Sequence, residues 1–116
     1  MNNNERDLFR LEHMRECIQK ITAIVNSVVV FDVFEKKWIE QDAMIRNFEI
    51  LGEAANHISD ETKSAYPEIE WFKIRGMRNF MTHEYFGIRM KTIWDTAIKD
   101  IPILGSQIDK IIAQFK

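Results

Sequence analysis

The sequence predicts an all-α fold, an antiparallel bundle of about four to five main helices. Through most of the 116 residues, apolar side chains recur every three or four positions, which is the period of an amphipathic helix. The run Val28–Phe31 has strand propensity, but the chain offers no second strand with which it could pair. A chain of this length fits one domain, so we expect a single helical domain over residues 1–116.

The most regular apolar pattern lies in residues 5–27. Its members form a seam with a period of about 3.5 residues: Leu8, Leu11, Met14, Ile18, Ile21, Val25 and Val28. The seam predicts a long amphipathic helix, and we expect a second copy of the chain to pack against it. Residues 28–36 are expected to form a connection that contains a short helical piece.

The next long helix is expected over residues 40–58. Gly52 interrupts its apolar pattern and costs about 1 kcal/mol relative to alanine, so we expect it to permit the close approach of another backbone. Ser59 or Asp60 then has the character of an N-cap. The short helix that follows should end before Pro67, because the residue that precedes a proline avoids the helical region.

Three more helices complete the expected bundle. One begins near residues 70–71 and runs to about Tyr85, with Gly87 as its C-terminal stop. The others cover residues 89–100 and 102–115, and Pro102 suits the first turn of the last helix. Three tryptophans are expected to anchor the core, namely Trp38, Trp71 and Trp94.

Composition narrows the class of protein. The N-terminus has no apolar segment typical of a secretory signal, and no run approaches the roughly 20 apolar residues of a membrane helix, so we expect a cytoplasmic protein without membrane contact. The single cysteine, Cys17, excludes an internal disulfide and is expected to be a small buried hydrophobe. His13 and His57 are expected at surface or half-buried positions. The histidines lack metal-ligand spacing, so we expect neither a metal site nor a cofactor.

Charge is distributed unevenly, although the formal net charge is only −2. Residues 32–70 hold ten acidic and four basic side chains, a balance of −6, whereas residues 73–91 have a balance of +4. The basic members of the second segment are Lys73, Arg75, Arg78, Arg89 and Lys91. A chance fluctuation on a solvated surface explains this pattern about as well as a phosphate-binding surface does.

The basic segment contains the pattern Arg-x4-His-x-Tyr, formed by Arg78, His83 and Tyr85. An arginine fork suits a phosphate and its developing charge, and a histidine can take a proton from a ribose 2′-hydroxyl or give one to a leaving oxygen. Asn79 lies one helical turn before His83 and could bind the imidazole or the substrate. The plainer alternative is that Arg78 and His83 only cap a helix or form ion pairs. Because cleavage is helped by both a base and an acid, a twofold dimer would supply two copies of His83.

These residues resemble a known family. The stretch Trp71–Tyr85 looks like the signature of HEPN-domain ribonuclease toxins of the HepT kind, and the Gly-Glu-Ala core of Arg46–Ala55 looks like their second-helix segment. Ile93-Trp94-Asp95 and Asp100-Ile101-Pro102 match the C-terminal pattern, so the resemblance covers about residues 5–113.

The resemblance implies a HEPN-type bundle, a homodimer with a composite active site, and metal-independent RNA cleavage as the toxin of a toxin–antitoxin pair. Arg78 and His83 match the catalytic pair, and Asn79 matches the polar residue that follows the arginine. Tyr85 matches the tyrosine that an MNT-type nucleotidyltransferase antitoxin modifies with AMP. RNA phosphate contacts are expected at Lys73, Arg75, Arg89 and Lys91. Some relatives of this fold serve only as partner modules for the nucleotidyltransferase, and this alternative stays open.

Overall fold

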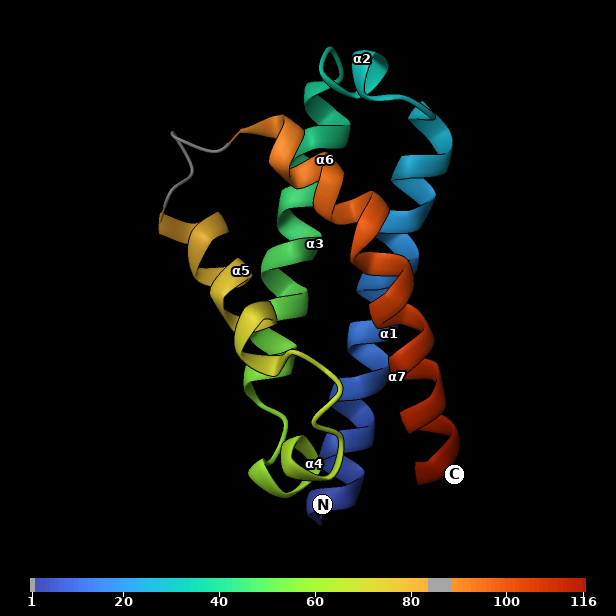
Figure 1. Cartoon of the computed structure of the whole chain (residues 1–116), viewed down its shortest axis with the longest axis vertical. Coiled ribbons are helices and arrows are strands. Elements are labelled where there is room, and N and C mark those ends of the chain that lie inside the picture. Colours follow the sequence, from blue (N-terminus) through green and yellow to red (C-terminus); the bar gives the residue numbers. More distant parts are fainter. Residues whose placement is uncertain (1, 84–88) are drawn as a thin grey trace.

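The computed structural model describes residues 2–83 and 89–116, with the helical backbone alone at Thr82 and His83. Seven helices and no strand occur in this part of the chain (Figure 1): α1 (Asn3–Val28), α2 (Phe31–Phe34), α3 (Trp38–Asn56), α4 (Asp60–Ala65), α5 (Trp71–His83), α6 (Met90–Lys99) and α7 (Ile101–Phe115). Five of them have ten residues or more. The prediction of an all-α bundle with four to five main helices is confirmed.

Helix α1 forms the centre of the bundle, with α3 and α7 packed along it (Figure 1). Five of the seven residues of its predicted seam are buried, with Leu11, Met14 and Ile21 fully so, and Leu8 and Val25 are half-buried. The helix prediction is therefore confirmed. The expectation that a second copy packs on this seam is wrong, because α3 and α7 of the same chain already cover it.

Helices α3 and α5 are in close contact at Gly52. A Cβ atom built on Gly52 would lie 2.2 Å from the Cβ of Arg78, a distance that no real pair of carbon atoms tolerates. The predicted role of Gly52 is confirmed, and the backbone it admits is that of Arg78. This contact fixes the position of Arg78 relative to α3.

A buried carboxylate ties the start of α1 to the start of α4. Asp7 is buried and accepts hydrogen bonds from the Ser59 amide (3.0 Å), the Ser59 hydroxyl (2.5 Å) and the Thr62 hydroxyl (2.6 Å). Ser59 is the N-cap of α4, as predicted, and its Oγ accepts from the Thr62 amide. The role of Asp7 was not predicted from the sequence, because its partners lie more than 50 residues away.

The tryptophans differ in burial. Trp94 is buried, with its ring centroid 5.0 Å from that of Phe34. Trp71 is half-buried, and its indole nitrogen donates to the carbonyl of Tyr66 at 3.1 Å. Trp38 is 69% exposed at the start of α3, so its prediction as a core anchor is wrong. Ile39, the next residue in the first turn of α3, is also 60% exposed, so this turn lies at the surface.

The remaining predictions concern the second half of the chain. Pro102 lies in the first turn of α7, as predicted. The predicted end of α5 near Tyr85 and the stop at Gly87 lie outside the described residues. Among the helices that the structure describes, none combines the length and the apolar character needed to span a bilayer.

Candidate active site

Three neighbours hold Arg78 in place on α5. Its Cβ packs against Gly52, its Nε lies 3.2 Å from the carboxylate of Glu53, and its Nη1 donates to the side-chain oxygen of Asn79 at 3.0 Å. Among the described residues, the Nη2 nitrogen has no partner. The guanidinium is thus oriented through Nε, while its terminal edge can still bind an anion such as a phosphate.

Glu53 connects Arg78 to a histidine. One carboxylate oxygen binds Arg78 and the other lies 3.1 Å from Nε2 of His57, one helical turn further along α3. Sequence reasoning missed Glu53, although it quoted the Gly-Glu-Ala segment. Its place in the sequence could have revealed it. Gly52 is predicted to contact another backbone, and Glu53 follows it directly, so the Glu53 carboxylate lies near that contact.

A polar cavity of about 280 Å³ opens beside Arg78 between α1, α3 and α5. Side chains that bear charge or can acquire it line most of it: Arg10, His13, Arg46, Glu49, Glu53 and Arg78. His13 is half-buried and His57 is exposed, as predicted. The basic surface around Arg78 therefore comes from three helices rather than from the basic sequence segment alone.

The other predicted phosphate contacts lie elsewhere. Lys73 forms an ion pair with Glu70 (3.8 Å), and Lys91 forms one with Asp95 (3.2 Å) while its ammonium lies 5.0 Å from the Phe31 ring centroid. Arg75 is exposed on α5, and Arg89 is exposed immediately before α6. None of these four residues lines the cavity beside Arg78.

His83 and Tyr85 complete the predicted motif. His83 is the last residue of α5, five positions after Arg78, and its side chain is outside the description. Tyr85 lies outside the described residues. The structure therefore brings together Arg78 and Asn79 and adds Glu53 and His57 to them.

Two further features concern the ligands that a metal would need and the single thiol. No group of three His, Cys, Asp or Glu side chains in the described part of the chain is arranged to hold a metal ion. Cys17 is buried on α1, and burial, with a smaller contribution from Glu16, raises the pKa of its thiol. A raised pKa lowers the fraction of thiolate, which is the nucleophilic form.

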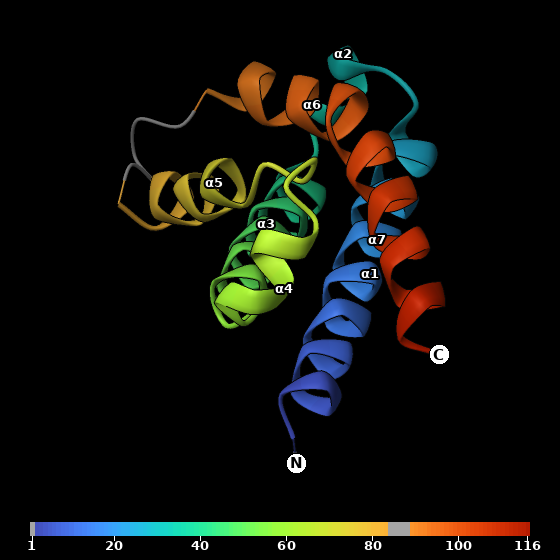
Figure 2. The same ribbon diagram turned by 60° about the horizontal axis from the view of Figure 1, so that its bottom comes forward.

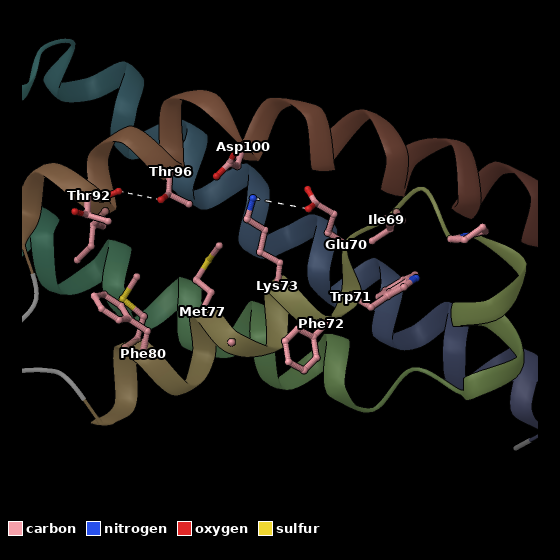
Figure 3. A pocket seen from close by; sticks show the side chains of 14 residues that line it. Ile69, Glu70, Trp71, Phe72, Lys73, Met77, Phe80, Thr92, Thr96 and Asp100 are labelled. Carbon is pink, nitrogen blue, oxygen red and sulfur yellow. Dashed lines mark hydrogen bonds and ion pairs between the residues drawn. The ribbon is translucent and has the colours of Figure 1, made fainter.

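An apolar groove of about 800 Å³ lies on the other side of α5, between α5 and α6. Figure 3 shows Met77 and Phe80 of α5 on one wall and Thr92 and Thr96 of α6 on the other. Phe72, also on α5, is 86% exposed beside it. Helix α5 thus separates a polar cavity at Arg78 from an apolar groove.

Comparison with known proteins decides the family. The model of the family described as "Ribonuclease HepT-like" matches residues 14–111. This chain belongs to the HepT-like ribonuclease family. The match includes Glu53, Arg78, His83 and Tyr85.

Individual relatives agree with this HepT-like assignment. The chain is 35% identical over 107 residues to a protein of Caldanaerobacter subterraneus subsp. tengcongensis that is named as a candidate RNase, with 91% of this chain and 94% of the relative covered. It is also 35% identical over 102 residues to a protein of Thermococcus cleftensis named probable ribonuclease HepT, covering 87% and 91% of the two chains. No solved structure matches this HepT-like chain.

Proposed function

We propose that this chain is a metal-independent endoribonuclease and the toxin of a HEPN/MNT toxin–antitoxin pair that acts in the cytoplasm. The observation that supports it best is the oriented Arg78, whose Nη2 has no partner among the described residues, within a chain of the HepT-like family. The family's description and its named relatives support RNA as the substrate.

In the proposed reaction, Arg78 binds the scissile phosphate through its terminal nitrogens. Because its Nε is already held by Glu53, the guanidinium does not need to reorganise as negative charge develops on the phosphate oxygens. Asn79 holds Nη1 from the other side. Both contacts favour a single orientation of the fork, which suits recognition of a phosphate.

His83 supplies the proton transfers. One copy removes the proton of a ribose 2′-hydroxyl, whose oxygen attacks the adjacent phosphorus. The bond to the 5′-oxygen then breaks, and a second copy of His83 gives that oxygen its proton. The products are a 2′,3′-cyclic phosphate and a free 5′-hydroxyl. One chain has one such histidine, so the mechanism requires a homodimer with a composite active site.

The homodimer needs a surface other than the seam of α1. The apolar groove beside α5 is the surface that we assign to it, because α5 carries both Arg78 and His83. A second copy seated there would bring two α5 helices, and so the two backbones that carry His83, close to one axis. The exposed Phe72 and Phe80 supply apolar area for such a contact.

Silencing is assigned to Tyr85, which would accept AMP from an MNT-type nucleotidyltransferase. Each AMP adds a phosphodiester with about one negative charge, two residues from His83, and this group would compete with RNA for Arg78. Co-expression with the partner, followed by intact mass spectrometry, tests the acceptor. Tyr85→Phe should lose the AMP-sized mass addition, whereas equal additions on wild type and variant would refute the assignment.

Growth of an expressing bacterium tests the toxin role. Induction of the wild-type chain should arrest growth, and His83→Ala should relieve the arrest without loss of helical circular dichroism. Arrest that persists at full strength in both His83→Ala and Arg78→Ala would refute the catalytic role. A folded wild-type chain that binds the nucleotidyltransferase but neither arrests growth nor cleaves RNA would instead be a partner module.

A further inference from the structure

The first turns of α1 carry a stripe of basic and aromatic side chains that the catalytic motif does not use. We propose that single-stranded RNA lies along this stripe on its way to Arg78, with a base on Phe9 and phosphates at Arg6 and Arg10. The inference rests on the proposed ribonuclease function and adds a substrate-binding track to it. Arg6, Phe9, Arg10 and His13 all precede residue 14, where the family match begins.

The spacing places these side chains on one face of α1. Arg6, Arg10 and His13 follow steps of four and three residues, and the stripe is about 10 Å long at the rise of an α-helix. Glu12 and Glu16 flank the stripe on one side, because both line a hollow together with Phe9 and His13, whereas Arg6 and Arg10 do not line that hollow. In the view of Figure 2, the N-terminal turns of α1 extend past the neighbouring helices. On these turns Arg6 and Phe9 are exposed, and Arg10 and His13 are half-buried.

Phe9 is presented as a stacking platform. Its ring is 56% exposed. The guanidinium carbon of Arg10 lies 5.8 Å from the ring centroid, and the His13 ring lies 6.5 Å away, tilted by 51°. An exposed aromatic ring beside arginine side chains is an arrangement with which proteins bind single-stranded nucleic acid, the ring stacking on a base and the guanidinium groups binding phosphates.

The stripe is continuous with the catalytic cavity. A hollow of about 530 Å³ is lined by Arg6, Phe9, Arg10 and His57. Arg10 also lines the 280 Å³ cavity that contains Arg78. His57 in turn binds Glu53, which holds Arg78. A strand on Phe9 can therefore reach Arg78 without crossing a helix.

Charge complementarity favours RNA as the occupant. Glu49 and Glu53, the acidic residues of the cavity, already lie beside Arg46 (3.9 Å) and Arg78 (3.2 Å). Within the part of the chain that the structure describes, Arg6 and Arg10 have no carboxylate partner within 4.0 Å. These two guanidinium groups thus remain available to a polyanion, whereas Lys73 is paired with Glu70, immediately before α5, and Lys91 is paired with Asp95 on α6.

Fluorescence anisotropy of a labelled twelve-residue oligouridylate tests the track. The full chain carries His83→Ala in every sample, so that the RNA stays intact. Phe9→Ala should weaken binding by roughly 5- to 100-fold, the range for loss of one stacked base. Arg10→Gln and Arg6→Gln should each weaken binding. Each should also make the slope of the logarithm of the association constant against the logarithm of the salt concentration less steep by about 0.7.

Two matched controls lie away from the stripe. Trp38→Ala removes another exposed aromatic ring, and Lys110→Gln removes one exposed charge on α7. Both should leave affinity within about twofold. Phe9→Leu preserves apolar volume without a π-face, so a loss in this folded variant as well excludes general damage to α1.

The possible results distinguish the proposed RNA-binding stripe from the proposed ribonuclease activity. Unchanged affinity in Phe9→Ala and Arg10→Gln, or an equal loss in the two controls, overturns the track, while cleavage by the chain with His83 intact would still support the ribonuclease. Selective loss in the stripe variants supports the track. If the chain with His83 intact cleaves no RNA, the ribonuclease proposal fails whatever the binding result.

Discussion

Glu53 on α3 and Arg78 on α5 lie with carboxylate and Nε 3.2 Å apart, and the pair orients the guanidinium of the proposed catalytic arginine. Both side chains are partly exposed, so the pair adds little to the stability of the fold. The ion pair acts by fixing geometry. A guanidinium held through Nε presents its remaining terminal N–H groups to a phosphate in one direction.

Glu53→Gln should therefore lower kcat more than it raises KM. Displacing a substrate-positioning group slows an enzyme by up to about 100-fold, and we expect a loss of about 10- to 100-fold here. Steady-state cleavage of a fluorogenic RNA measures both constants. Glu49→Gln, which removes the carboxylate one turn away beside Arg46, is the control and should have a much smaller effect. Equal kcat values for wild type and Glu53→Gln would contradict the positioning role.

The Gly52–Arg78 contact predicts opposite effects at two glycines. Gly52→Ala would place a methyl group 2.2 Å from the Cβ of Arg78 and should destabilise the fold by about 1–3 kcal/mol. Gly76→Ala adds a methyl group with nothing within 4 Å, inside α5, and should stabilise it by about 0.5–1 kcal/mol. Urea unfolding measures both changes, and a stabilised Gly52→Ala variant would show that α3 and α5 are further apart than described.

Asp7 should be the most sensitive acidic residue for stability. Asp7→Ala leaves the two hydroxyls and the amide at the start of α4 without their acceptor and should cost about 2–4 kcal/mol. Asp109→Ala breaks a long, exposed pair with Arg15 (3.9 Å) and should cost at most about 1 kcal/mol. Thermal unfolding of both variants compares them, and equal shifts in Tm would contradict the assigned role of Asp7.

The assignment of the dimer to the groove beside α5 predicts that Phe72→Lys weakens self-association. The substitution adds a charge to a surface that a second copy would cover, and an unpaired charge is costly once it is removed from water. Sedimentation equilibrium at micromolar concentration measures the effect. Trp38→Lys adds the same charge at the start of α3 and should leave the dimer intact; dissociation by both variants, or by neither, would count against this interface.

The sequence patterns predicted what depends on neighbours along the chain. The period of α1, the Ser59 N-cap and the Pro102 position are local features, and each is confirmed. The close approach at Gly52 is also confirmed, because a glycine inside an apolar helical pattern is itself a local signal, although the backbone that approaches it belongs to another helix. The two predictions that were wrong concern which part of the protein, if any, packs against a given side chain. The seam of α1 reveals that it is buried but not by which helix, and an aromatic residue such as Trp38 carries no signal that its turn lies at the edge of the bundle.

For the candidate site, too, the sequence indicated only the residues that lie close together along the chain. The spacing within Arg78–Tyr85 is local and was visible, whereas Glu53 and the cavity residues Arg10 and Arg46 come from other helices. Their relation to Arg78 depends on how α1, α3 and α5 pack, which no single stretch of sequence specifies. The uneven charge of the sequence pointed to Lys73 and Lys91, which form ion pairs with Glu70 and Asp95, and it gave no indication of Arg10 or Arg46.

Cleavage of RNA by the purified chain in the presence of EDTA tests the central claim most directly. A labelled RNA is incubated with wild type, Arg78→Ala and His83→Ala, and the new ends are identified by mass spectrometry. The account predicts 2′,3′-cyclic phosphate ends from the wild type and a rate at least about 100-fold lower in each variant, the loss typical of a missing acid–base or charge-stabilising group. Undiminished cleavage by His83→Ala, or a wild-type chain that cleaves only when a divalent metal is added, would contradict it.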